Sequence, residues 1–76
     1  MSIQLTTVYN FEVANNHNYY VGQNQILAHN KGGSCFEAGT LIMKDNGFET
    51  IENIKIGDNV LSYNEQHHKN EYSKVL

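Results

Sequence analysis

The apolar residues of this chain lie in short runs that alternate with polar residues, and stretches rich in Asn and Gly separate the runs. An alternation with a period of about two is typical of half-buried β-strands, whereas an amphipathic helix needs a period of about 3.6 residues. No segment sustains the helical period. Proline is absent, and Asn and Gly accept the positive φ angles of tight turns. The sequence therefore predicts an all-β fold.

The alternation predicts strands in both halves of the chain, joined by tight turns. They cover residues 8–13, 19–21, 25–29, 40–43, 48–51, 59–63 and 71–76. The last of these strands is expected to stop unpaired at the end of the chain. Residues 44–47 are predicted to form a hairpin turn of type I′, because an Asn-Gly pair favours that geometry. One turn of helix is expected at residues 52–54.

The chain is short, with 76 residues of which 39% are hydrophobic. A domain of this size buries only roughly 60% of its unfolded surface, so a staple or a partner is expected to support it. The single cysteine rules out an internal disulfide. Because the core is small and the last strand is expected to be unpaired, we expect a second polypeptide to complete the fold. This partner would be a complementary fragment or a second copy that exchanges strands.

The charge balance and the histidine spacing exclude several classes of function. The net charge is −3, and the five basic residues are all lysines that form no cluster. This composition argues against binding to nucleic acid or to an anionic membrane surface. No apolar run approaches the roughly 18 residues of a membrane span. His67 and His68 could join another histidine around a metal, but no Cys or carboxylate lies at ligand spacing, so neither a metal nor a cofactor is expected.

The side chains that suit proton transfer or nucleophilic attack include those of His17, His29, Asn30 and Cys35. Each has an ordinary structural interpretation when it is taken alone. A single cysteine is often a small buried apolar residue, and histidine or asparagine at a strand end often belongs to a turn. Residues 31–34, with the sequence KGGS, indicate a flexible connector between two halves of different character.

Taken together, the motifs of the two halves resemble the two ends of one known family. The segments VYNFEV (8–13), HNYYVG (17–22) and ILAHN (26–30) resemble the carboxy-terminal end of an intein or intein-like domain. The segments CFEAGTLI (35–42), GF (47–48), IENI (51–54) and GDNVLSY (57–63) resemble the amino-terminal end of the same superfamily. This superfamily is that of the Hint (hedgehog/intein) domains, and the closest similarity is to the bacterial intein-like and pretoxin branch.

The resemblance implies an unusual domain organisation, because the two ends occur in the reverse of the family's order. Residues 1–30 would be the carboxy-terminal intein segment, residues 31–34 the connector, and residues 35–76 the amino-terminal intein segment. The middle of the family's domain has no counterpart in these residues. The resemblance therefore implies a horseshoe-shaped β fold of the Hint type that is permuted and incomplete. About 17 Å, the extended length of the connector, is enough to join two ends at one active centre.

The resemblance also assigns roles to the four side chains. Cys35 would attack the carbonyl of the residue before it, because a thiol is intrinsically nucleophilic. Asn30 would cyclise and break its bond to Lys31, while His29 and His17 would assist the proton transfers. Splicing needs Cys, Ser or Thr after the asparagine, so Lys31 restricts the expected activity to cleavage. The Thr-x-x-His motif of the family is absent after Cys35, which implies dormant or slow chemistry.

Two other interpretations compete with self-processing. The chain could be a catalytically inert fragment-association module, or an engineered piece of a split intein in which only fragment pairing remains. It could also be an unrelated small β domain, which would require both motif matches to be accidental. Cleavage at the 30–31 or 34–35 bond would distinguish self-processing from both of these interpretations.

Overall fold

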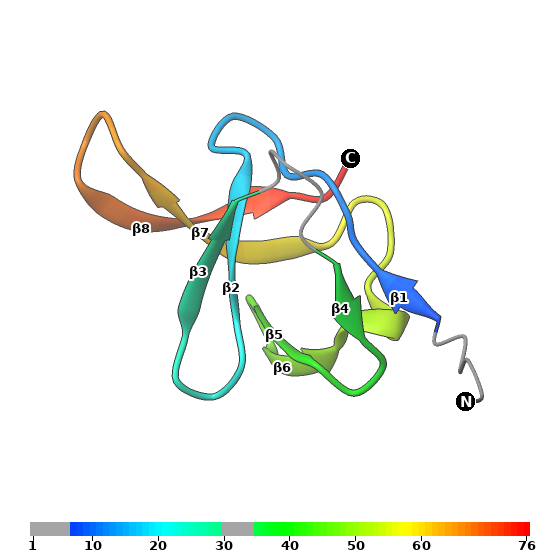
Figure 1. Ribbon diagram of the computed structural model, residues 1–76. Helices are drawn as coiled ribbons and strands as arrows, with labels where there is room; N and C mark the ends of the chain where they lie inside the picture. Colours follow the sequence, from blue (N-terminus) through cyan, green and yellow to red (C-terminus); the bar gives the residue numbers. More distant parts are fainter. Residues whose placement is uncertain (1–6, 30–34) are drawn as a thin grey trace.

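The computed structural model describes residues 7–29 and 35–76, which form short β-strands and one turn of 3-10 helix (Figure 1). The strands are β1 (Val8–Tyr9), β2 (Asn18–Val21), β3 (Ile26–His29), β4 (Phe36–Glu37), β5 (Leu41–Lys44), β6 (Gly47–Thr50), β7 (Asn59–Asn64) and β8 (Lys69–Lys74). The helical turn η1 covers Ile51–Asn53, close to its predicted position. All the strand pairs are antiparallel. The prediction of an all-β fold is confirmed.

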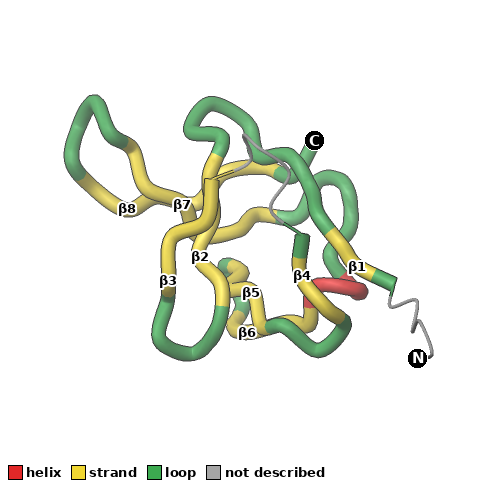
Figure 2. Tube along the Cα trace, viewed as in Figure 1, coloured by secondary structure: helices red, strands yellow, loops and turns green. Residues whose placement is uncertain are grey.

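The two halves of the chain pair with each other. The larger sheet has the order β3-β2-β5-β7-β8, with β6 paired to β5, and the smaller sheet joins β1 to β4 (Figure 2). The larger sheet is continuous across the two halves because Val21 of β2 lies opposite Ile42 of β5. A further bridge joins Val13 to Val75. The connector 31–34 and Asn30 lie outside the described residues.

The core lies where the two halves meet. Its buried apolar members are Val13, Tyr19, Val21, Ile42, Ile51, Val60 and Val75. Tyr9, Phe11, Ala28, Phe36 and Ile54 are partly buried and pack against this group. Burial of apolar area contributes about 25 cal/mol per Å². Because each half supplies only some of these core side chains, the full stabilisation requires both halves to pack together. The two halves therefore share one core.

The last strand differs from its prediction. The sequence suggested an unpaired strand at residues 71–76, but β8 begins at Lys69 and pairs with β7 along its whole length. Beyond β8, the backbone N–H of Leu76 donates to the carbonyl of Glu12 at 2.9 Å. The prediction was wrong because β8 forms a hairpin with the preceding strand β7, and the two residues after β8 meet Val13 and Glu12, more than sixty positions earlier in the chain.

The hairpin between β5 and β6 also differs from its prediction. A type I′ turn needs positive φ at both central residues, which are Asp45 and Asn46 in the observed register. Neither of them has a positive φ, and Gly47 takes it instead, with φ 116°. The positive φ is therefore one position later than predicted, at the first residue of β6. Separately, no helix in the described part of the chain is long and apolar enough to cross a membrane.

Candidate functional site

The structure places three of the four predicted site residues. Cys35 is exposed and directly precedes β4. His29 is the exposed last residue of β3, and His17 is exposed directly before β2. The fourth, Asn30, lies outside the described residues together with the connector 31–34. The two chain segments that flank the connector are thus the end of β3 and the start of β4.

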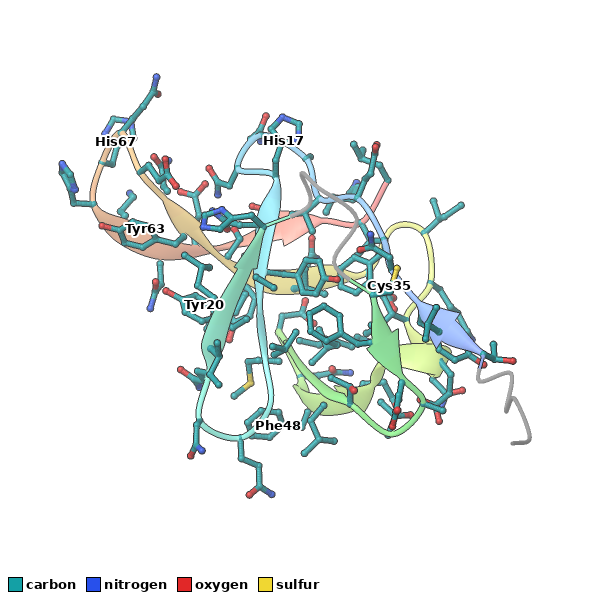
Figure 3. The ribbon with its side chains drawn as sticks, in the orientation of Figure 1. His17, Tyr20, Cys35, Phe48, Tyr63 and His67 are labelled. Carbon is teal, nitrogen blue, oxygen red and sulfur yellow. The ribbon has the colours of Figure 1, made fainter. Side chains whose placement is uncertain are left out.

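Tyr19 connects these two flanking segments. Its backbone lies opposite Ala28 of β3 in the sheet register. Its ring is stacked on Phe11, with ring centroids 4.0 Å apart, and meets Phe36 edge-on at 6.2 Å. Phe36 is the residue after Cys35, so Tyr19 meets one flank of the connector through its backbone and the other through its ring. Figure 3 shows Cys35 at the start of β4.

The register of the small sheet places Asn10 beside Cys35. Tyr9 of β1 lies opposite Phe36 of β4. In an antiparallel pair, one step forward on one strand corresponds to one step back on the other, so Asn10 and Cys35 are opposite each other just beyond the paired residues. By this register, the backbone of Asn10 lies across from the backbone of Cys35.

The Tyr19 hydroxyl links the buried core to this pair. It donates a hydrogen bond to Asn10 Oδ1 at 3.0 Å. Burial, and in smaller part the negative charge that Cys35 carries when ionised, raises the pKa of Tyr19 to about 12. The hydroxyl therefore keeps its proton at neutral pH and remains a hydrogen-bond donor.

His17 does not join Cys35. Its backbone has φ 55° and follows Asn15, which has φ 69° and belongs to the predicted Asn-rich turn. Figure 3 shows the His17 ring projecting outward at the end of the turn, away from Cys35. The structure thus gathers Cys35, Tyr19 and the end of β3 into one region and leaves His17 outside it.

A polar network holds the His17 turn on the β7–β8 hairpin. Asn16 Nδ2 lies 2.9 Å from Ser62 Oγ, 3.0 Å from Glu71 Oε2 and 3.3 Å from Ser73 Oγ. Asn64 Nδ2 donates to the other oxygen of Glu71 at 3.2 Å. These amide donors, Asn16 first, lower the pKa of Glu71 below its ordinary value of 4.5.

This network predicts an acid-sensitive turn. A carboxyl whose pKa is depressed in the folded state adds stability above its unfolded pKa, and that contribution is lost as the pH falls through the folded value. We expect Glu71→Gln to reduce the drop in thermal midpoint between about pH 6 and about pH 3. Thermal unfolding followed by circular dichroism measures it. Glu65→Gln, which removes a carboxylate from the turn between β7 and β8, should retain the acid-induced drop in thermal midpoint. An equal drop in the wild type and in both variants would contradict the assignment to Glu71.

A surface hollow of about 520 Å³ lies between the His17 turn and the β7–β8 turn. It is lined by Asn15, Asn16, Asn64, Glu65, Gln66 and Glu71. Cys35 and His29 do not line it. The hollow is therefore separate from the two described residues that flank residues 30–34.

Sequence reasoning missed Asn10 and Tyr19 as members of the functional region, and Asn16 as the anchor of the His17 turn. Asn10 lies in a predicted strand, and Asn16 looks like an ordinary turn residue because its partners lie 46–57 positions away in the chain. A weak signal was available for Asn18, a polar residue that opens an aromatic strand. It is fully buried, and its side chain bonds both backbone groups of Tyr63.

No group of three or more His, Cys, Asp or Glu side chains within residues 7–29 and 35–76 is arranged to hold a metal ion. Comparison with protein-family models, with curated proteins and with solved structures gives no significant match to this chain. The resemblance to Hint domains consequently stays a prediction made from the sequence motifs.

Proposed function

We propose that this chain is a self-processing domain of the Hint (hedgehog/intein) type, with its carboxy-terminal segment placed before its amino-terminal segment. The observation that carries the proposal is the position of Tyr19 between the two flanks of the connector. Its backbone pairs with Ala28, close before Asn30. Its ring packs against Phe36, next to Cys35. This proximity is what two coupled cleavage sites at one centre require.

The step at Cys35 is an acyl shift from nitrogen to sulfur. The thiol attacks the carbonyl carbon of Ser34, a C–S bond forms, and the peptide C–N bond breaks. The thiol proton ends on the released amino group of Cys35. Water or an added thiol then cleaves the thioester and separates residues 1–34 from residues 35–76. The exposure of Cys35 supports this role, because a buried thiol could not reach water or an added thiol.

The step at Asn30 is cyclisation. Its side-chain nitrogen attacks its own backbone carbonyl, the bond to Lys31 breaks, and a succinimide remains on Asn30. The proton lost by the attacking nitrogen is transferred to the departing amine, with His29 as the general acid and base. His17 would assist only if its turn moved, because its ring projects away from Cys35. Lys31 offers no side chain that can accept an acyl group by the usual splicing route, so the proposed outcome is cleavage.

The fold that we propose for this activity is a permuted and incomplete Hint horseshoe. A second chain that completed it would have to add at an open sheet edge. Among the described strands of the larger sheet, β3, β6 and β8 each pair on one side only, so they are the edges available to a complementary fragment or a second copy.

Incubation with dithiothreitol, followed by intact-mass measurement under denaturing conditions, tests the proposal. We expect thiol-dependent cleavage at the 34–35 bond that Cys35→Ala abolishes, and thiol-independent cleavage at the 30–31 bond that Asn30→Ala abolishes. His29→Ala should slow the second cleavage by about 10²–10⁴-fold, the usual cost of losing a general acid or base. His67→Ala, in the exposed turn between β7 and β8, is the matched control and should cleave normally.

A second candidate function is a catalytically inert association module. The pairing of the two halves through β1–β4 and β2–β5 favours it, because fragment pairing alone would be enough for that role. The same mass measurement separates the two candidates. Cleavage at either junction supports self-processing, whereas a chain that stays intact with thiol and after addition of a complementary fragment supports the association module.

A further inference from the structure

The turn between β5 and β6 contains the only asparagine of the chain that is followed by a glycine, Asn46. The carbonyl carbon of an asparagine side chain can be attacked by the backbone nitrogen of the next residue, because the attack closes a five-membered ring. A side chain on that next residue hinders the attack, and glycine has none. The sequence therefore places the easiest ring closure of this kind at the 46–47 peptide bond.

The side chain of Asn46 is exposed and unrestrained. Within residues 7–29 and 35–76, no hydrogen bond joins it to another group. By contrast, Asn53 donates to Thr50 Oγ1 at 2.9 Å, and Asn59 donates to Asp45 Oδ2 at 3.3 Å. Hydrogen bonds thus hold these neighbouring asparagines in fixed orientations, whereas the Asn46 carboxamide can turn toward its own backbone.

The backbone nitrogen of Gly47 can be reached. A Cβ atom placed on Gly47 would meet nothing within 4 Å, so the space beside this residue is open. Lys44 and Gly47 are the last pair of the β5–β6 ladder, next to the turn. Among the described strands, β6 pairs only with β5, and the end of a ladder at a sheet edge opens at little cost. Such an opening frees the Gly47 nitrogen for attack.

We propose that Asn46 is a site of spontaneous self-modification, at which the chain converts a side-chain amide into a carboxylate. The Gly47 nitrogen attacks the side-chain carbonyl carbon of Asn46 and forms a C–N bond. The amide nitrogen leaves as ammonia, which carries away the proton of the attacking nitrogen. Water then opens the resulting succinimide at either carbonyl and gives aspartate or isoaspartate. The chain stays continuous, and Cys35 and Asn30 take no part, so the inference is independent of the proposed cleavage.

The isoaspartyl product changes the geometry of the hairpin. Its main chain runs through the side-chain carbons of residue 46, so the turn gains one backbone atom. The turn has two central residues, Asp45 and Asn46, and the length of such a turn fixes the register of its strands. Both products also place a second carboxylate beside Asp45. The modification therefore weakens the pairing of β6 with β5.

Incubation of the whole chain in mildly alkaline native buffer, followed by tryptic digestion and mass spectrometry, tests the proposal. Trypsin cleaves after lysine, so Asn46 and Asn53 fall in one peptide, residues 45–55. We expect conversion of amide to acid to be at least about tenfold faster at Asn46, because the branched side chain of Ile54 hinders attack at Asn53. A sample digested without incubation gives the conversion that digestion itself causes.

Asn46→Gln is the matched variant. Its longer side chain would have to close a six-membered ring, which forms far more slowly, and the position is exposed, so the variant should fold like the wild type. After the incubation, the thermal midpoint of the wild type should fall by about 4–8 °C, the shift usual when a domain of this size loses a modest part of its stability. The midpoint of Asn46→Gln should stay unchanged.

Three results would overturn the proposal. Equal conversion at Asn46 and Asn53 would remove the special role of Gly47. A chain that is not converted in native buffer, whether or not it is converted in urea, would show that the folded hairpin blocks the attack. A converted wild type with an unchanged thermal midpoint would show that the β5–β6 pairing tolerates the products. Failure of the proposed cleavage is detected separately, because the peptide 45–55 contains neither the 30–31 nor the 34–35 bond.

Discussion

Replacing Ile42 with alanine is expected to lower the free energy of unfolding by about 2–5 kcal/mol, the cost of emptying a buried aliphatic site. Ile42 is fully buried and lies opposite Val21, where the two halves of the chain pair. Small domains are stabilised by only about 5–15 kcal/mol in total, so the variant should lose a large share of its stability. Urea denaturation followed by circular dichroism measures the loss.

The chain contains a matched control for this substitution. Ile56 is the same residue type, but 83% of its surface is exposed. Ile56→Ala should change the free energy of unfolding by no more than about 0.5 kcal/mol, as is usual for surface sites. If Ile42→Ala and Ile56→Ala had the same small effect, the two halves would not share one core, and the junction at β2–β5 would be wrong.

Replacing Asn18 with alanine is expected to destabilise the chain by about 2–5 kcal/mol, because it removes the hydrogen-bond partner of the Tyr63 carbonyl and of the Tyr63 N–H. The side chain is fully buried, donates to the Tyr63 carbonyl at 3.0 Å and accepts from the Tyr63 N–H at 2.8 Å. It thus serves β7 as a neighbouring strand would. Without it, both groups of Tyr63 would be left without their partner, and each such group costs about 1–3 kcal/mol.

Asn18→Asp separates the hydrogen bond that the Asn18 side chain donates from the one that it accepts. An ionised aspartate still accepts from the Tyr63 N–H but can no longer donate to the Tyr63 carbonyl, and it also places a charge in the core. We therefore expect Asn18→Asp to be at least as unstable as Asn18→Ala at neutral pH and to recover part of its stability in mild acid. Asn24→Ala, in the exposed turn between β2 and β3, is the control and should be close to the wild type. A neutral result for Asn18→Ala would show that water replaces the side chain.

Local patterns in the sequence predicted most of the strands and their approximate bounds. The alternation at residues 19–21 and 59–63 became β2 and β7, and the Asn-rich stretch became a turn with positive φ at Asn15 and His17. These features depend on neighbours in the chain, so local propensity and periodicity are sufficient to find them. The same reasoning placed Gly47 at a central position of its turn, whereas it is the first residue of β6; element bounds are commonly misplaced by one or two residues.

Contacts between distant residues could not be predicted in this way. The bridge from Val13 to Val75, the pairing of β2 with β5 and the pairing of β1 with β4 all depend on how the halves fold onto each other. The motifs at Cys35 and His29 indicated which side chains to consider, but the role of Tyr19 came only from its three-dimensional neighbours. A buried phenol in an aromatic strand is, by sequence alone, indistinguishable from any other core residue.

The pairing of the two halves has a practical consequence for any cut in the connector. Strands on each side of it are held by β1–β4, by the Val21–Ile42 contact and by the Val13–Val75 bridge. A nicked chain would therefore stay assembled as a non-covalent pair of peptides under native conditions. Size measurements in native buffer would report an unbroken particle even after complete hydrolysis, and only an unfolding solvent would release the two pieces.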